Sequence, residues 1–183
     1  MKIYISILRG INVGGHKSIK MDVLKKLYSD LLLENIQTYI QSGNVVFQSY
    51  NTKSEDLAAL ISNKIQKEFG FTVPVIVLDK NEFKDIIENN PFVYDEAKDI
   101  TKLCITFLAS KPKQFDLEAI KLKQTQKEEF QITEKAIYMY CPNGFATTKL
   151  TITFFEKQLN VIATTRNLKT SNKLLSIAEE MAK

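Results

Sequence analysis

The chain has 183 residues, of which 44% are hydrophobic and 25% charged, and its formal net charge is +4. This is the composition of an ordinary globular protein, long enough for one large domain or two small ones. It excludes a membrane span, because no apolar run approaches about 18 residues, and a signal peptide, because only six residues separate Lys2 from Arg9. Two cysteines, Cys104 and Cys141, exclude a disulfide framework, and their 37-residue separation matches no zinc motif. We therefore expect a cytoplasmic protein with reduced thiols and without a metal, a cofactor or a membrane partner.

The first half of the chain predicts the element order β-α-β-β-α-β. We expect a strand over 2–8, a helix from Met21 to Leu32, strands over 36–40 and 45–47 around a hairpin turn at 41–44, a helix from 52 to 69, and a strand over 73–78. Thr52 and Glu55 form a capping box for the second helix, and Gly70 ends it. This order is the ferredoxin-like pattern, whose fourth strand lies at an edge of the sheet, where Pro74 is tolerated.

The second half of the chain repeats the pattern after a linking segment. Asp79 and Glu82 are expected to cap a linking helix that ends before Pro91, and a loop follows over 91–101. The next predicted elements are a strand over 102–109, a helix over 113–122, strands over 129–133 and 136–140, a helix over 148–159, a strand over 161–164 and a helix over 168–181. The sequence thus predicts an α+β fold of two tandem ferredoxin-like subdomains with antiparallel sheets, divided as 1–79, a linker 80–101, and 102–183.

Positive charge is concentrated in two short segments. Residues 1–26 contain six Lys or Arg and one acidic residue, residues 149–173 contain five and one, and residues 27–148 carry a net charge of −4. Such clustering favours an anionic partner at a local site over a generally basic surface. The alternative, that these lysines lie on solvated helix faces, stays open.

The predicted topology brings loops from distant parts of the chain together. In β-α-β-β-α-β, residues 9–17 and 41–44 lie at one end of the first sheet, and residues 142–149 and 164–167 lie at one end of the second. Both pairs combine glycines, amides and a basic residue with helix N-termini, which suit anions. The predicted ligand-binding residues are Arg9, Gly10, Asn12, Gly14, Gly15, Gln41, Ser42, Asn44, Asn143, Lys149, Arg166 and Asn167. Turn formation, capping and structural ion pairs are the alternative roles for these residues.

The stretch "GINVGGHKS" resembles a nucleotide-binding P-loop with one residue too many. His16 displaces Lys17 by one position, and neither a magnesium-binding Asp after a later strand nor a doubly wound parallel sheet is predicted. We therefore reject the P-loop, while another Gly-rich anion site stays open. His16 is the only histidine, so no histidine cluster can bind a metal. It is a candidate acid/base, and a nucleophile pair with Ser42 or Cys141 is conceivable.

Seven distinctive motifs are spread over nearly the whole chain. In order they are "LRGINVGGHKSIKM", "TYIQSGNVVF", "FGFTVPV", "NPF", "YCPNG", "KLTITFFEKQL" and "ATTRN". Together they resemble the bacterial domain-of-unknown-function family 1697. The resemblance implies a bacterial protein with two ferredoxin-like subdomains and brings no agreed activity, substrate or catalytic residue. The chain departs from the family pattern at Thr147, where a basic residue is frequent, and at Leu168, where an aromatic residue is frequent.

The leading functional hypothesis is a protein that binds an anionic, phosphate-bearing small molecule or nucleotide at these loops. An enzyme acting on a phosphorylated or nucleotide substrate is the second hypothesis, and it would use His16. A nucleic-acid-binding protein that uses the same basic segments is the third, and it predicts a steep dependence of affinity on salt. A purely structural or assembly role remains the alternative to all three, and the sequence does not indicate an oligomeric state.

Overall fold

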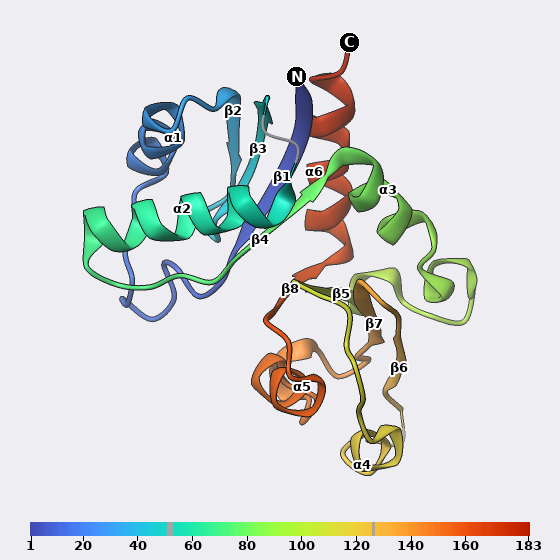
Figure 1. Ribbon diagram of the computed structural model, residues 1–183. Helices are drawn as coiled ribbons and strands as arrows, with labels where there is room; N and C mark the ends of the chain where they lie inside the picture. Colours follow the sequence, from blue (N-terminus) through green and yellow to red (C-terminus); the bar gives the residue numbers. More distant parts are fainter. Residues whose placement is uncertain (51–52, 126) are drawn as a thin grey trace. The chain divides into compact units, whose positions relative to one another are not determined.

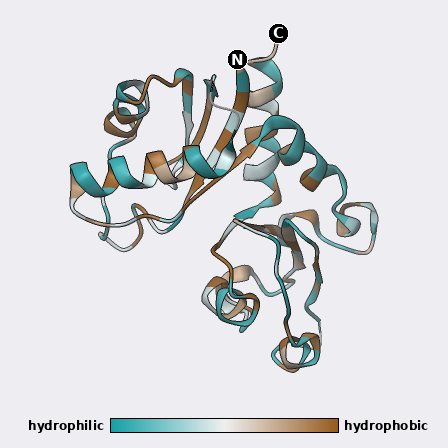
Figure 2. Ribbon diagram, viewed as in Figure 1, coloured by the Kyte–Doolittle hydropathy of each residue, from teal (hydrophilic) through white to brown (hydrophobic). Residues whose placement is uncertain are grey.

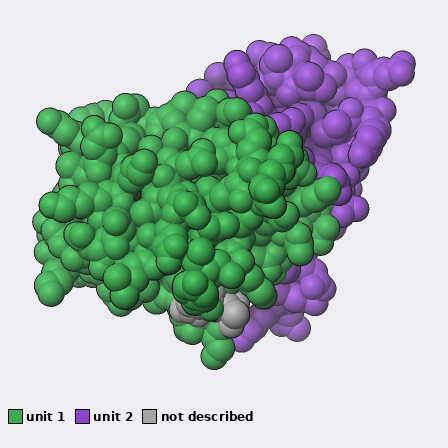
Figure 3. All heavy atoms as spheres, turned by 90° about the horizontal axis from the view of Figure 1, so that it is seen from above, with its two compact units in different colours: residues 1–85, 173–183 green, residues 86–172 purple. Residues whose placement is uncertain are grey.

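The computed structural model describes residues 1–50, 53–125 and 127–183. The chain divides into two compact units, which Figure 3 shows in different colours. Unit 1 contains Met1–Asp85 and Lys173–Lys183, and unit 2 contains Ile86–Asn172. Each unit contains a four-stranded antiparallel sheet, so the α+β class and the tandem arrangement predicted from the sequence are confirmed.

Unit 1 has the ferredoxin-like element order (Figure 1). Its elements are β1 (Lys2–Leu8), α1 (Met21–Asp30), β2 (Glu34–Tyr39), β3 (Asn44–Ser49), α2 (Ser54–Phe69) and β4 (Val75–Asp79). The strands lie in the order β2-β3-β1-β4, and every neighbouring pair is antiparallel. Pro74 therefore precedes an edge strand, as its missing N–H requires. The predicted cap at Thr52 lies outside the described residues.

The central strand β1 of the sheet in unit 1 is buried on both faces. Tyr4 and Leu8 of β1 pack into the core shared with α1 and α2, while Ile5 and Ile7, which point the other way, are equally inaccessible. This two-sided burial explains why β1 is a nearly continuous apolar run, and Figure 2 shows the same hydrophobic character in the central strands.

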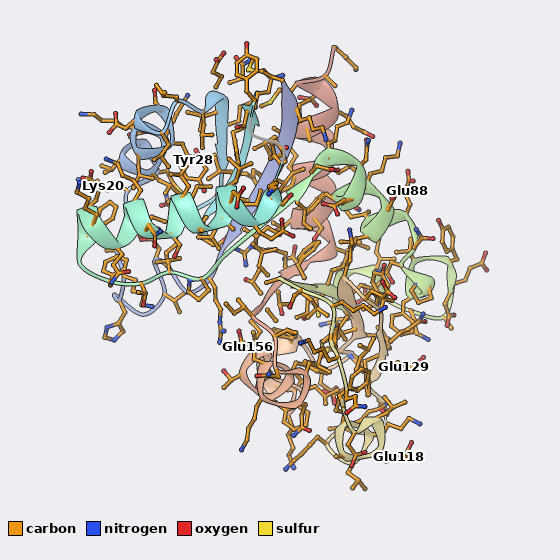
Figure 4. The ribbon with its side chains drawn as sticks, in the orientation of Figure 1. Lys20, Tyr28, Glu88, Glu118, Glu129 and Glu156 are labelled. Atoms are coloured by element: carbon orange, nitrogen blue, oxygen red, sulfur yellow. The ribbon has the colours of Figure 1, made fainter. Side chains whose placement is uncertain are left out.

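The polar atoms of this core are paired. Ser6 Oγ and Tyr28 Oη are 2.8 Å apart where α1 meets β1, and Figure 4 shows Tyr28 between the helix and the sheet. Burial raises the pKa of Tyr28, so its hydroxyl stays protonated.

Unit 2 repeats the topology. Its elements are β5 (Leu103–Leu108), α4 (Leu117–Lys121), β6 (Glu129–Ile132), β7 (Ala136–Tyr140), α5 (Ile152–Leu159) and β8 (Ala163–Asn167). The strand order β6-β7-β5-β8 matches that of unit 1. Residues of α4 and α5, among them Ile120 and Phe155, pack on one face of the sheet. On the other face Tyr138 donates a hydrogen bond from Oη to the carbonyl of Ile86, at 2.8 Å.

Two predicted helices of unit 2 are wrong at their beginnings. The helix expected over 113–122 begins at Leu117, because Asp116 is its N-cap and accepts a hydrogen bond from the N–H of Ala119 at 3.0 Å. The helix expected from 148 begins at Ile152, because Thr151 Oγ1 accepts the N–H of Phe154 at 3.2 Å. Capping side chains, rather than apolar periodicity, decide where both helices begin.

Residues 165–167, which were predicted to follow the strand over 161–164, belong to the strand itself. They are part of β8, whose residues pair with β5 from Ala163↔Leu108 to Asn167↔Cys104. The apolar residues that suggested a strand over 161–164 mark only its beginning. The threonines continue it, since β-branched side chains fit a strand. Arg166 and Asn167 are therefore strand residues and not loop residues.

Two helices, α3 (Lys80–Glu88) and α6 (Leu168–Glu180), each have their first residues in one unit and their last residues in the other. α3 begins with the predicted capping box, in which Asp79 Oδ1 accepts the N–H of Glu82 at 2.9 Å and Glu82 Oε2 accepts the N–H of Asp79 at 3.3 Å. The last helix, α6, has its C-terminal half in unit 1, where Glu179 lies 3.7 Å from Lys84. The compact units thus differ from the predicted ranges 1–79, 80–101 and 102–183 at α3 and at α6. The segment 91–101, predicted as a loop, contains the short 3-10 helices η1 (Pro91–Tyr94) and η2 (Ile100–Lys102).

Two predicted apolar helix positions in unit 1 are exposed. Leu60 of α2 is 41% exposed. Leu32 is 87% exposed and lies beyond the end of α1, where its φ of +59° ends the helical path. The helical spacing of apolar residues thus extends two residues beyond the end of α1 at Asp30.

Candidate functional site

A two-residue hairpin turn occupies the centre of the loop after β1. Val13 and His16 form an antiparallel bridge, and the N–H of His16 donates to the carbonyl of Val13 at 3.0 Å. Between them Gly14 and Gly15 have φ values of +58° and +77°, the combination that a type I′ turn needs at both central positions. The stretch that looked like a miscounted P-loop is thus a tight hairpin, and His16 is one of the two residues that close it.

Asn12 fastens this hairpin to the rest of unit 1. Its Oδ1 accepts the N–H of Ile19 at 2.8 Å, and its Nδ2 donates to the carbonyls of Ile19 at 2.9 Å and Gln41 at 2.8 Å. The last of these bonds joins the loop after β1 to the β2–β3 hairpin. Asn12 was predicted to bind a ligand, and both hydrogens of its amide are used inside the protein.

A buried asparagine stabilises the turn between β2 and β3. Asn44, which is fully buried, donates from Nδ2 to the carbonyl of Tyr39 at 3.1 Å and to Ser42 Oγ at 2.9 Å. Gly43 has a φ of +74°, and a Cβ at this position would lie 2.6 Å from the Cβ of Leu8. This close approach is the reason for a glycine here, and it presses the turn against the end of β1.

A third segment, at the start of β4, joins the same end of the sheet. The N–H of Arg9 donates to the carbonyl of Pro74 at 3.0 Å, and Lys17 Nζ donates to the carbonyl of Thr72 at 2.7 Å. We call residues 9–19, 40–43 and 70–74 the first loop cluster. Residues 70–74 were not predicted to belong to it. The signal was available, because the fourth strand of this topology begins beside the end of the first.

Some polar groups of the first loop cluster are left exposed. The N–H groups of Gly10, Gly14 and Gly15 find no acceptor among the residues that the structure describes. The side chains of His16 and Gln41 are exposed as well.

Lys20, just before α1, adds an exposed positive charge next to this cluster (Figure 4). In this part of the chain the only acidic residue up to Lys26 is Asp22. The exposed backbone N–H groups of the cluster are therefore hydrogen-bond donors in a basic segment of the chain.

A second loop cluster lies at one end of the sheet in unit 2. We define it as residues 141–151 together with Asn167 and Leu168, where β8 passes into α6. Tyr140 pairs with Leu103 and Asn167 with Cys104, so the chain leaves β7 and β8 beside the beginning of β5. Of the segment 164–167, which was predicted to meet 142–149, this register places Asn167 at that end of the sheet, whereas Thr164 pairs with Phe107 further along β5.

The predicted ligand residues of the second cluster differ in their surroundings. Lys149 and Asn143 are exposed. Asn167 caps α6, because its Oδ1 accepts the N–H of Thr170 at 2.7 Å. Thr147 also has a local role, since its hydroxyl bonds to the carbonyls of Asn143 at 3.1 Å and Gly144 at 2.9 Å. Lys149 is thus the exposed charge of this cluster, next to the beginning of α5.

Arg166 leaves the sheet on the face opposite α4 and α5. It pairs with Ile105, whereas its neighbour Thr165 lies on the helix side and shares a 2.7 Å hydroxyl contact with Thr106. Its Nη1 donates to the carbonyl of Thr165 at 2.8 Å and to Thr164 Oγ1 at 3.2 Å. Burial lowers the pKa of Arg166 from 12.5 to about 10, because a charged group is disfavoured where water is excluded. The structure therefore places Arg166 on a different face from the side chains that pack under α5.

The described part of unit 2 also has a small cavity away from both clusters. It has a volume of about 280 Å³ between α4 and β6 and is lined by Phe115, Leu117, Lys121, Gln124, Phe130, Gln131 and Ile132. None of the predicted site residues lines it.

Within the described residues, no three His, Cys, Asp or Glu side chains come together as a metal site would require. No described helix is long and apolar enough to cross a membrane.

Both units have the same topology, and each carries polar loops at one end of its sheet. The protein is therefore an α+β protein of two ferredoxin-like units. The chain belongs to the family of proteins of unknown function DUF1697, whose model matches residues 1–138. The motifs at 140–167 that contributed to the resemblance lie outside the matched residues. No curated protein matches the chain.

A solved structure resembles the whole chain. The conserved bacterial protein SP0830 from Streptococcus pneumoniae matches with a TM-score of 0.73 and 22% sequence identity, over 97% of this chain and 98% of that chain. At this identity the likeness supports the fold alone.

Proposed function

We propose that the first loop cluster binds a phosphate-bearing small molecule or nucleotide. The observation that carries the proposal is the backbone from Gly10 to Lys17. Positive φ values occur there at Gly10, Asn12, Gly14, Gly15 and Lys17. The N–H groups of Gly10, Gly14 and Gly15 stay exposed without an acceptor among the described residues, and exposed backbone donors of this kind suit an anion.

The side chains around this backbone divide into two roles. Asn12, Ser42 and Asn44 hold the loops together through the hydrogen bonds described above, so they are positioning residues. Arg9 and Gln41 are proposed to contact the ligand, because a guanidinium binds phosphate oxygens in pairs and an exposed amide completes such a site. The predicted set of eight residues thereby narrows to Arg9, Gln41 and the backbone of the three glycines.

The second loop cluster is proposed as a separate anion contact. Lys149 is exposed beside the beginning of α5, whose first N–H groups favour negative charge. Arg166 is placed outside this contact, because it bonds to its own strand on the opposite face of the sheet.

Calorimetric titration of the full chain with pyrophosphate, AMP and ATP at low salt tests the proposal. We expect Arg9→Ala to weaken binding about tenfold or more, since a charge-assisted hydrogen bond contributes about 1.5–3 kcal/mol. Lys25→Ala is the matched control, because Lys25 is an exposed charge of the same segment on α1. Equal affinity in the two variants would remove Arg9 from the site, and absence of binding for all three ligands would refute the proposal.

The backbone contribution is tested at the turn. Gly14→Asn keeps the turn, because Asn-Gly is favoured in type I′ geometry, and we expect it to retain binding. Gly14→Ala combined with Gly15→Ala disfavours the turn, and we expect binding to be lost while the protein stays folded. Titrations at rising salt separate a small ligand from nucleic acid, whose affinity falls steeply as counterions are released.

A further inference from the structure

The only two cysteines of the chain lie together inside unit 2. Cys104 is in β5 and Cys141 directly follows β7, and they are 4% and 1% exposed. Both belong to the core cluster under α4 and α5, together with Met139. Nothing in the spacing of the two residues along the sequence indicated this neighbourhood.

The strand register explains why the thiols meet. Cys104 pairs with Met139, and the N–H of Cys141 donates to the carbonyl of Lys102 at 3.0 Å, which continues the same register by one step. Cys104 and Cys141 are therefore diagonal neighbours on one face of the sheet. The next diagonal pair along the same strands, Thr106 and Met139, is in contact, with 3.8 Å between Oγ1 and Sδ.

The surroundings polarise the pair. A hydrogen bond from Cys104 lowers the pKa of Cys141, and the same bond, followed by burial, raises the pKa of Cys104. Burial and the charge of Glu128, which is 5% exposed, act in the opposite direction and raise the pKa of Cys141. Cys141 directly follows the end of β7 and is assigned as the thiol that reacts first, while Cys104, which pairs with Met139 inside the ladder, is the one that reacts second.

We propose that Cys104 and Cys141 are a disulfide-forming site that a peroxide oxidises. The thiolate of Cys141 attacks one oxygen of hydrogen peroxide, the O–O bond breaks, and a sulfenic acid and hydroxide form. The sulfur of Cys104 then attacks the sulfur of the sulfenic acid and releases its oxygen as water, with the thiol proton of Cys104. In total two thiols and one peroxide give one disulfide and two waters.

The position of Cys141 makes closure compatible with the fold. A disulfide needs its Cβ atoms at about 3.5–4.5 Å, which is closer than diagonal neighbours usually lie. Cys141 is one residue beyond β7, so a shift of the chain there gives up its N–H bond to the carbonyl of Lys102 and leaves the paired residues of β5 and β7 in place. The bond would tie the beginning of the second loop cluster to the central strand of unit 2.

Peroxide treatment of the folded chain, followed by intact mass measurement, tests the proposal. We expect the wild-type protein to lose two hydrogen atoms and to regain them with a reductant. Cys104→Ser is expected instead to gain oxygen at Cys141, because the second thiol is missing. Cys104→Ala serves the same purpose if the serine variant fails to fold. Wild-type protein that gains oxygen without losing hydrogen, or that reacts only in denaturant, would overturn the proposal.

The thermal midpoint gives an independent measurement. A disulfide between residues 104 and 141 closes a long loop, so the oxidised protein is expected to melt several degrees higher than the reduced protein. The matched control is Cys141→Ser, whose midpoint should not change with peroxide. An oxidised wild-type protein that melts lower than the reduced one would show that the bond distorts the native structure.

Discussion

The side-chain amide of Asn12 pairs with both backbone groups of Ile19, accepting its N–H at 2.8 Å and donating to its carbonyl at 2.9 Å. Asn12 thus closes the loop after β1 with a pair of hydrogen bonds like the pair that two residues of neighbouring strands exchange. A φ of +57° is needed for this geometry, and asparagine tolerates it better than most residues. The additional bond to the carbonyl of Gln41 makes this residue the link between two parts of the first loop cluster.

Removing the Asn12 amide should therefore loosen the cluster. We expect Asn12→Ala to lower the free energy of unfolding by about 2–4 kcal/mol, from lost hydrogen bonds and from alanine at positive φ. Asn12→Gly keeps the backbone freedom and loses only the bonds, so it should be less destabilising. Urea unfolding measures both variants, and wild-type stability in Asn12→Ala would contradict the linking role.

Gly43 and Gly70 allow steric contact to be separated from backbone strain. Both have φ near +75°, but a Cβ on Gly43 would meet Leu8 at 2.6 Å and Ile11 at 2.8 Å, while nothing lies within 4 Å of one on Gly70. We expect Gly70→Ala to cost about 1 kcal/mol and Gly43→Ala to cost about 1–3 kcal/mol more. Denaturant titration measures the difference, and equal losses would show that strain alone acts at Gly43.

Ile40 carries backbone strain without the compensation of burial. Its φ is +49° although its side chain is β-branched, and it is 49% exposed. We expect Ile40→Gly to raise the free energy of unfolding by about 1 kcal/mol, because the strain is relieved and little apolar contact is lost. Ile40→Val keeps the branched side chain and should bring no gain. A destabilised glycine variant would mean that Ile40 packs better in solution than its exposure indicates.

Lys98 connects several parts of unit 2. Its side chain is 9% exposed, and its Nζ lies 2.6 Å from Asp95 Oδ2 and 2.8 Å from Glu129 Oε1, above the rings of Phe92 and Tyr140 at 5.5 Å and 5.3 Å. The hydrogen bond from Lys98 lowers the pKa of Asp95 below its usual 3.8. Because this pKa is lower in the folded state, its stabilising effect is present above pH 3.8 and disappears as the pH falls through the folded value.

Lys98→Met should therefore lower the thermal midpoint at neutral pH, and this difference from wild type should shrink in acid. Melting curves from neutral pH to below pH 3.8 measure it. Lys111→Met is the control, because its ion pair with Glu134 is between side chains that are 65% and 68% exposed and should contribute little. A difference that stays constant across this range would show that Lys98 acts by packing and not through Asp95.

Much of the fold could be read from local patterns. Alternating and continuous apolar runs predicted all eight strands, and Gly70 and the Asp79–Glu82 box marked helix ends where the structure has them. Errors arose where a polar capping side chain or strand pairing, and not the apolar pattern, set the end of an element. Asp116 and Thr151 set the beginnings of α4 and α5, and pairing with β5 extended β8 to Asn167.

The candidate site shows the same division. Glycine positions, charge clustering and the convergence of residues 9–17 with 41–44 follow from chain order, because residue type limits backbone conformation and topology places strand ends. Which hydrogen bonds each side chain makes, and on which face of a sheet it lies, was decided only by the tertiary structure. The amides of Asn12 and Asn44 donate hydrogen bonds to the carbonyls of Gln41 and Tyr39. The strand register places Arg166 on the face of the sheet opposite α4 and α5. The meeting of Cys104 with Cys141 is likewise a product of register, because pairing between strands joins residues whose separation along the chain carries no information about distance.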